Sequence, residues 1–148
     1  MDTGKLRVRL RRLEDTVNDL RHLPPLTLTE YLSKKDRQAI VERWLQIAAQ
    51  VCLDAGASVV AEYGLSAPDE LPNIFVTLAE AGLIPEELGR RMVGLTRFRN
   101  ILVHDYLTID PRIVFERSTE GLVDFDDFGK AIVALIEKHE SQDRDSNE

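Results

Sequence analysis

The sequence predicts an all-α protein: an up-and-down bundle of five or six helices, in a single domain that spans residues 1–148. Apolar residues recur every three or four positions along most of the chain, which is the spacing of one helix face. The 8 glycines and 6 prolines fall mainly between these segments, and alternating β-branched runs, typical of strands, are absent. With 148 residues and 43% hydrophobic content, the chain is long enough to bury a core.

The first half of the chain predicts two principal helices. The first ends at Pro24-Pro25, because proline cannot continue a helix; its apolar stripe is formed by Leu6, Leu10, Leu13, Val17 and Leu20. Thr27 to Glu30 then has the form of a capping box, and Ser33 to Asp36 offers a second helix start. The longest helix follows and ends at Gly64; its apolar face carries Val41, Trp44, Ala48, Val51, Ala55 and Val59.

A loop over residues 65–72 separates this half from a short helix over residues 73–81, which Gly82 closes. Pro85-Glu86-Glu87 is typical of a first helical turn, since proline suits the opening position and acids suit the positive end of the helix dipole. The helix that begins there is predicted to run to about Tyr106.

Two further helices are predicted in the C-terminal part, the first capped by Asp110-Pro111 and the last opened by Asp124. The polar tail is expected to fray from about residue 141. Charge is unevenly distributed along the chain. The segment from Glu116 onward contains ten acids and four bases, whereas residues 1–23 contain six bases and four acids.

Composition excludes several classes of function. The single cysteine, Cys52, allows neither an intramolecular disulfide nor a cysteine-based metal site. The acidic run 124–127 lacks the ligand spacing of a calcium loop, so its acids are interpreted as helix-cap and first-turn residues. No signal-peptide core and no membrane-spanning apolar run is present, so a cytoplasmic protein is expected. The net charge of −7 weakens a nucleic-acid hypothesis without excluding it.

The helix after Pro85 differs from ordinary core helices. At 100° per residue, its apolar side chains from Leu88 to Val103 spread around nearly the whole circumference, which predicts a helix that is buried either in its own bundle or against a partner. Polar residues are nevertheless set into it: Arg90, Arg97, Arg99, Asn100 and His104. A buried arginine needs an anionic partner. An internal acid, a subunit interface or a bound anion could supply it.

Residues 99–106 (RNILVHDY) resemble the Arg-x4-His-x-Tyr motif of the HepT toxins, which belong to the HEPN superfamily of helical ribonucleases. The likeness extends over about residues 5–140. It includes the long helix containing residues 36–41 and 45–48, the position of the motif near the end of its helix, and the Asp110-Pro111 that follows.

This resemblance implies a toxin of a toxin–antitoxin system: a metal-independent ribonuclease without cofactor, acting on RNA such as tRNA as a symmetric dimer. It implies that Arg99 and His104 are catalytic. Arg97 and Asn100 are expected to support them. It also implies that Tyr106 receives AMP from a cognate minimal nucleotidyltransferase antitoxin.

The chemistry is consistent with these residue types, because imidazole transfers protons near neutral pH and guanidinium binds phosphate. Five residues along an ideal helix, however, place Arg99 and His104 about 140° apart. Either the helix is distorted before Tyr106, or two copies of the motif meet across a dimer axis, and we expect the second. The alternative function is a non-catalytic helical partner of a nucleotidyltransferase, which the acidic composition favours.

Overall fold

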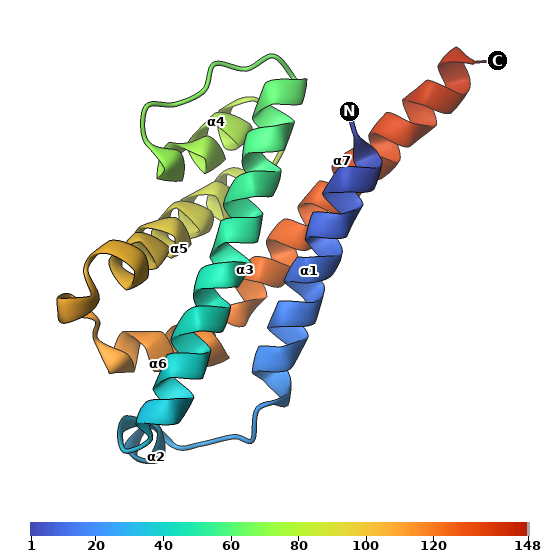
Figure 1. Cartoon of the computed structure of the whole chain (residues 1–148). Helices are drawn as coiled ribbons and strands as arrows, with labels where there is room; N and C mark the ends of the chain where they lie inside the picture. The colour runs from blue at the N-terminus through green and yellow to red at the C-terminus, as the bar shows by residue number, and fades with distance from the viewer. Residues whose placement is uncertain (148) are drawn as a thin grey trace.

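The computed structural model describes residues 1–147 and is all-helical over that range (Figure 1), which confirms the predicted fold class. Residues 1–147 form seven α-helices rather than five or six, because Ser33 and Lys34 separate a short helix from the long one. The elements are α1 (Thr3–His22), α2 (Leu28–Leu32), α3 (Lys35–Glu62), η1 (Leu71–Asn73), α4 (Ile74–Glu80), α5 (Glu86–His104), η2 (Tyr106–Thr108), α6 (Pro111–Thr119) and α7 (Leu122–Ser146).

Local signals in the sequence set several of these boundaries. The predicted capping box at the start of α2 is present: the hydroxyl of Thr27 accepts a hydrogen bond from Glu30 N (3.2 Å), and the Glu30 carboxylate accepts one from Thr27 N (3.0 Å). Gly64 and Gly82 end α3 and α4 with φ values of +65° and +74°, a left-handed conformation that favours glycine.

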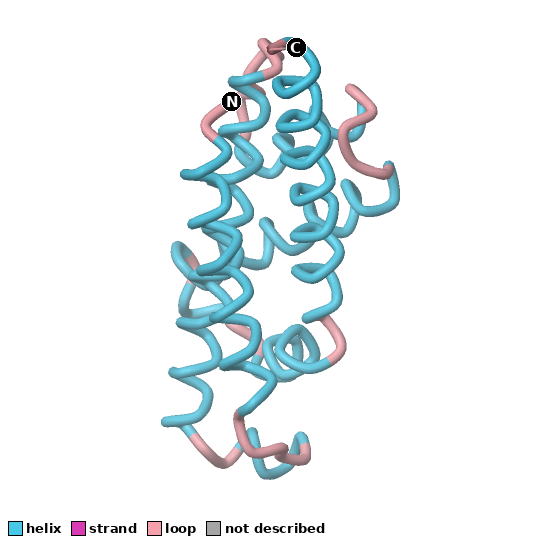
Figure 2. The backbone as a smooth tube through the Cα atoms, turned by 90° about the vertical axis from the view of Figure 1, so that its right-hand side faces the viewer, coloured by secondary structure: helices cyan, strands magenta, loops and turns pink. Residues whose placement is uncertain are grey.

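Helix α3 is the centre of the bundle, because α1, α2, α4, α5, α6 and α7 all pack against it. Figure 2 shows the long helices running side by side along one axis. Small residues let the neighbours come close: a Cβ added at Gly56 would lie only 2.9 Å from Ile74 Cγ2 of the adjoining segment. By length and composition α3 could cross a membrane, but 50% of its most apolar window is buried within the bundle, as expected of a core helix.

Helices α5, α6 and α7 are joined by an ion-pair network centred on Asp124. Arg91 Nη1 donates to Asp124 Oδ1 at 2.7 Å and to Asp127 Oδ2 at 3.0 Å, while Arg117 Nη1 lies 3.7 Å from Asp124 Oδ2. Asp124 was predicted to open the last helix; α7 instead begins at Leu122, because Gly121 precedes it. Asp124 therefore lies in the first turn, where its buried carboxylate neutralises two arginines.

The C-terminal end of α7 extends past the rest of the bundle (Figure 1), and residues 141–146 continue it as helix. Their side chains are exposed, so no packing holds this stretch in place. The fraying predicted from about residue 141 therefore stays a prediction.

Replacing Asp124 with asparagine should lower the free energy of unfolding by about 2 kcal/mol, because Arg91 and Arg117 would lose a largely buried carboxylate partner. Asp126→Asn is the matched control. It removes the more exposed pair with Arg21 and should cost less than about 1 kcal/mol. Urea unfolding followed by circular dichroism measures both values. Equal losses would contradict the central role given to Asp124.

Candidate active site

Helix α5 ends at His104, two residues before the predicted limit. Asp105 leaves the helical region with φ −133° and ψ 51°, although its backbone N–H still donates to the carbonyl of Ile101 at 2.9 Å. Residues 106–108 then form a separate 3₁₀ turn. Since α5 is α-helical through His104, the 140° offset expected between Arg99 and His104 is not relieved by the change of direction that follows.

Arg99 leaves α5 toward α3 and is held there by two amides. Its Nη1 donates to Asn100 Oδ1 at 3.0 Å, and its Nη2 donates to Gln50 Oε1 of α3. The Nε atom is buried and has no hydrogen-bond partner. Within residues 1–147, no carboxylate oxygen lies within 4.0 Å of this guanidinium. Of the three compensating partners considered above, the internal acid is therefore excluded in this part of the chain.

The other arginines of α5 show that acids are available to this helix. Arg90 forms an ion pair with Glu86 (3.9 Å), and Arg91 pairs with Asp124 and Asp127. The hydrogen bond that Arg91 donates to Asp124 raises the pKa of Arg91 above its ordinary value. Neutral amides, in contrast, leave the charge of Arg99 uncompensated while fixing its position.

Gln50 is a site residue that the sequence analysis did not identify. Its Nε2 donates to Asp54 Oδ1 at 2.9 Å, so its amide oxygen is the atom turned toward Arg99. It lies on the polar side of the longest helix, between positions of the apolar stripe. The spacing of apolar residues along the sequence does not show that α5 packs against α3 at this point. A glutamine opposite an unpaired arginine becomes recognisable only when the contact between α3 and α5 is known.

Within the single chain, α5 is not buried on all sides, so the chain's own bundle does not cover the whole helix. Arg97, Ile101 and His104 lie on one exposed face, and Ile101 keeps 41% of its surface exposed. Asn100, at the edge of this face, is half-buried and accepts the hydrogen bond from Arg99. Within residues 1–147, no hydrogen bond or ion pair fixes the imidazole of His104.

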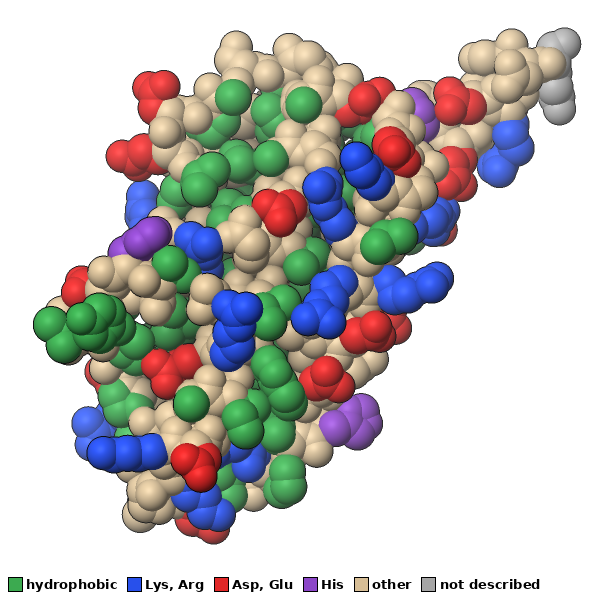
Figure 3. Space-filling model, viewed as in Figure 1, with side chains coloured by type: hydrophobic (Ala, Val, Ile, Leu, Met, Phe, Trp, Pro, Cys, Tyr) green, Lys and Arg blue, Asp and Glu red, His purple; other side chains and the backbone are tan. Residues whose placement is uncertain are grey.

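The turn after α5 projects from the bundle. Tyr106 is 72% exposed and Leu107 is 85% exposed, the largest values among the exposed bulky hydrophobic residues. Figure 3 shows hydrophobic side chains protruding at the edge of the molecule where this turn lies. The tyrosine hydroxyl is therefore freely accessible.

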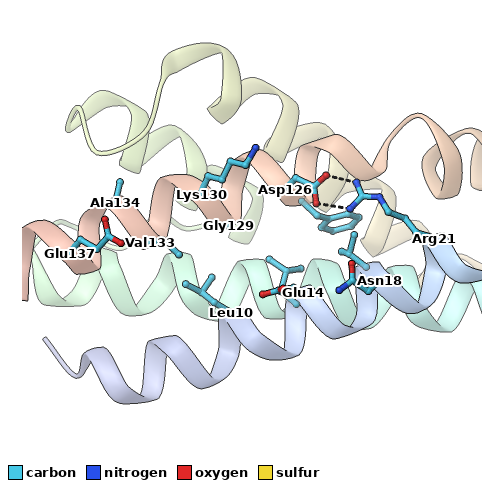
Figure 4. Close-up of a pocket in the computed structure, with 13 residues that line it drawn as sticks. Leu10, Glu14, Asn18, Arg21, Asp126, Gly129, Lys130, Val133, Ala134 and Glu137 are labelled. Carbon is cyan, nitrogen blue, oxygen red and sulfur yellow. Dashed lines mark hydrogen bonds and ion pairs between the residues drawn. The ribbon is translucent and has the colours of Figure 1, made fainter.

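A cavity of about 530 Å³ lies elsewhere, between α1 and α7. Figure 4 shows Arg21 and Asp126 paired across one end of it and Glu137 at the other. None of the motif residues lines this cavity. Within residues 1–147, no group of three or more His, Cys, Asp and Glu side chains could hold a metal ion.

The chain is similar to known proteins over most of its length. The family model described as "Ribonuclease HepT-like" matches residues 10–132. This chain belongs to the HepT-like ribonuclease family. The match confirms the family predicted from residues 99–106, and it falls within the span of about 5–140 over which the resemblance was seen.

Two curated HepT proteins are similar in sequence. One, named tRNA nuclease HepT, from Aphanizomenon flos-aquae, is 27% identical over 110 residues, covering 74% of this chain and 75% of that protein. The other, named mRNA nuclease HepT, from Shewanella oneidensis, is 30% identical over 90 residues, covering 61% of this chain and 68% of that protein.

Solved structures share the fold at lower identity. The protein YutE of Bacillus subtilis, described as a cytosolic protein of unknown function, superimposes with a TM-score of 0.81 at 18% identity, covering 94% of this chain and 93% of YutE. A tri-AMPylated HEPN toxin of Shewanella oneidensis, in complex with its MNT antitoxin, gives 0.78 at 22% identity, with coverage of 87% and 96%. These likenesses show that this HepT-like chain shares the fold of both proteins.

Proposed function

We propose that this HepT-like chain is the toxin of a cytoplasmic toxin–antitoxin pair and cleaves RNA, with tRNA as the first substrate to test. The observation that carries the proposal is the Arg99 guanidinium, held by Asn100 and Gln50 with no carboxylate partner within residues 1–147. A fixed, uncompensated and partly desolvated cation is suited to a phosphate. Its place in the family motif, five residues before His104, specifies a phosphate in an RNA backbone.

Cleavage would proceed by attack of a ribose 2′-oxygen on the adjacent phosphorus. The 2′-hydroxyl proton passes to a basic imidazole, the P–O5′ bond breaks, and the 5′-oxygen takes a proton from an imidazolium, leaving a 2′,3′-cyclic phosphate. His104 supplies the proton transfers, since an imidazole can act as acid and base near neutral pH. Arg99 stabilises the negative charge of the phosphorane. No step requires a metal or a cofactor.

The neighbouring polar residues support this chemistry. Asn100 holds the Arg99 guanidinium through the 3.0 Å hydrogen bond. Arg97 is exposed on the same face as His104, where it can contact a phosphate next to the one that is cleaved.

A symmetric dimer would complete the site. Arg99 points to α3 while His104 lies at the exposed end of α5, and an ideal helix separates them by about 140°. A second copy docked on the exposed face of α5 would bring its own imidazole toward Arg99. The same contact would cover Ile101, an apolar residue that is 41% exposed between Arg97 and His104.

Tyr106 is the proposed site of regulation by a cognate nucleotidyltransferase. The phenol oxygen would attack the α-phosphorus of ATP, pyrophosphate would leave, and the phenolic proton would pass to solvent. The side chain is 72% exposed and two residues from His104, so it is accessible and close to the site. Each AMP adds a negative phosphodiester near Arg99, which repels the RNA backbone.

Catalysis predicts that the purified protein cleaves labelled tRNA in excess chelator, and that His104→Ala or Arg99→Ala lowers the rate by at least about 100-fold. Retained helical circular dichroism would show that the variants fold. Arg90→Ala, which removes an exposed arginine paired with Glu86, is the control and should retain activity. Intact RNA with wild-type protein at low salt would instead favour the non-catalytic partner.

If Arg99 of one subunit and His104 of the other form one site, two inactive variants should complement each other. Mixing Arg99→Ala and His104→Ala protein and allowing subunits to exchange should restore about one quarter of wild-type activity, because half of the dimers then contain one intact site of two. If each chain forms its own site, the mixture remains inactive. Sedimentation of the wild-type protein gives the oligomeric state independently.

Regulation predicts that co-expression with the nucleotidyltransferase increases the intact mass of the chain by whole AMP units. Tyr106→Phe should abolish the increase, because it removes the only attacking oxygen while keeping the ring. Tyr63→Phe, at a 40% exposed tyrosine that ends α3, is the control and should leave the mass increase unchanged. An unmodified wild-type chain, or modification that persists in Tyr106→Phe, would contradict this assignment.

A further inference from the structure

The two flanks of α1 differ in how their cations are neutralised. On the flank toward α7, Arg7 pairs with Glu140 at 3.1 Å, and Arg21 pairs with Asp126. On the flank toward α3, three cations follow one another at helical spacing: Lys5, Arg9 and Arg12. Within residues 1–147, none of these three side chains has a carboxylate within 4.0 Å.

The acids near this flank are occupied. Asp2 caps α1 by accepting a hydrogen bond from Lys5 N at 3.0 Å, and Glu62 pairs with the N-terminal ammonium group at 2.5 Å. Asp54 accepts the amide N–H of Gln50. Lys5, Arg9 and Arg12, which we name the α1 stripe, therefore form a cationic surface on a chain whose net charge is −7.

The α1 stripe lies on the same side of the molecule as Arg99. Arg9 Nη1 donates to Ser58 of α3, and Arg99 donates to Gln50 of the same helix. These two contacts are eight residues apart, about 12 Å along the helix axis, and they flank one solvent-facing ridge. Figure 3 shows Lys and Arg side chains gathered over α1 and the adjoining face of α3.

The exposed ridge of α3 adds a further cation, Arg43, to this face. A hollow of about 280 Å³ between α1 and α3 is lined by Lys5, Arg9 and Ser58, together with Asp2 and Glu62. The arrangement thus offers a hollow with both cationic and acidic lining residues at one end and the Arg99 guanidinium at the other, while Arg43 lies seven residues beyond Gln50, on the side away from Ser58.

We infer that the α1 stripe binds the backbone of the RNA outside the cleavage position and so extends the site proposed above, on which this inference rests. A distance of about 12 Å corresponds to roughly three or four phosphates at the 3.4 Å axial spacing of a nucleic-acid strand. Contacts of this kind set affinity and orientation and carry no base specificity. An acidic protein could bind a polyanion in this way, because the cations of the α1 stripe have no carboxylate within 4.0 Å among residues 1–147.

The test compares two double variants of the full-length chain that carry the same change in charge. Arg9→Gln/Arg12→Gln alters the α1 stripe. Arg7→Gln/Arg11→Gln alters the other faces of the same helix, and each pair contains one arginine with a hydrogen-bond partner and one without. Binding of end-labelled tRNA is measured in a His104→Ala background between 50 and 200 mM NaCl, roughly the range over which phosphate contacts are resolved.

Loss of two phosphate contacts should weaken binding about tenfold and make the slope of log K against log salt shallower by about 1.4 to 1.8. The control variant should bind within about twofold of the wild-type protein. In the catalytically competent background, the stripe variant should raise KM with little change in kcat, because it does not touch the reacting phosphate.

Equal weakening by both double variants would overturn the inference, since net charge alone would then account for binding. If wild-type protein cleaves tRNA and Arg9→Gln/Arg12→Gln leaves both KM and the salt slope unchanged, the inference fails and the proposed function stands. If wild-type protein neither binds nor cleaves tRNA at 50 mM NaCl, roughly the lower end of the useful range, both fail together.

Discussion

The structure of the candidate site depends on how one guanidinium is held. A carboxylate beside Arg99 would have stabilised the single chain and cancelled the charge that a phosphate requires. Two amides hold the Arg99 guanidinium in place without cancelling its charge: Asn100 from the same helix and Gln50 from α3. The buried, unsatisfied Nε of Arg99 indicates that this arrangement has a cost in the free chain. Such a cost is expected of a cation that is held for a phosphate, as in the site proposed above.

Helix α3 converts this local contact into an extended surface. It supplies Gln50 to Arg99 on one side and Ser58 to Arg9 on the other, so a single rigid helix sets the distance between the two cationic regions. Its own core face fixes it, since Ala48, Ala55 and Val59 are fully buried. Changes in the packing of α3 would therefore displace the motif and the α1 stripe relative to each other.

Much of this fold could be predicted because its signals are local: the stripe from Leu6 to Leu20, the Thr27–Glu30 capping box, and the glycines at 64 and 82. The motif residues were also proposed from the sequence, through their resemblance to the HepT motif. The contact of Gln50 with Arg99 was not, because it joins positions 49 residues apart. The exposed face of α5 could not be located from the sequence, because apolar periodicity does not tell a face covered by the chain's own core from one left for a partner. Ile101 is the clearest instance.

Charge placement explains how an acidic chain is compatible with RNA. Asp124, Asp126 and Glu140 of α7 neutralise arginines that join α7 to α1, α5 and α6, so these acids act in the fold. Among residues 1–147, Arg9 and Arg12 of α1 and Arg99 of α5 have no carboxylate within 4.0 Å. Net charge is therefore a poor guide to polyanion binding in a protein of this kind, because a phosphate responds to the charges within about 10 Å, the screening length at 0.1 M salt. What decides binding is which cations the fold has already neutralised, and Arg99 is not among them.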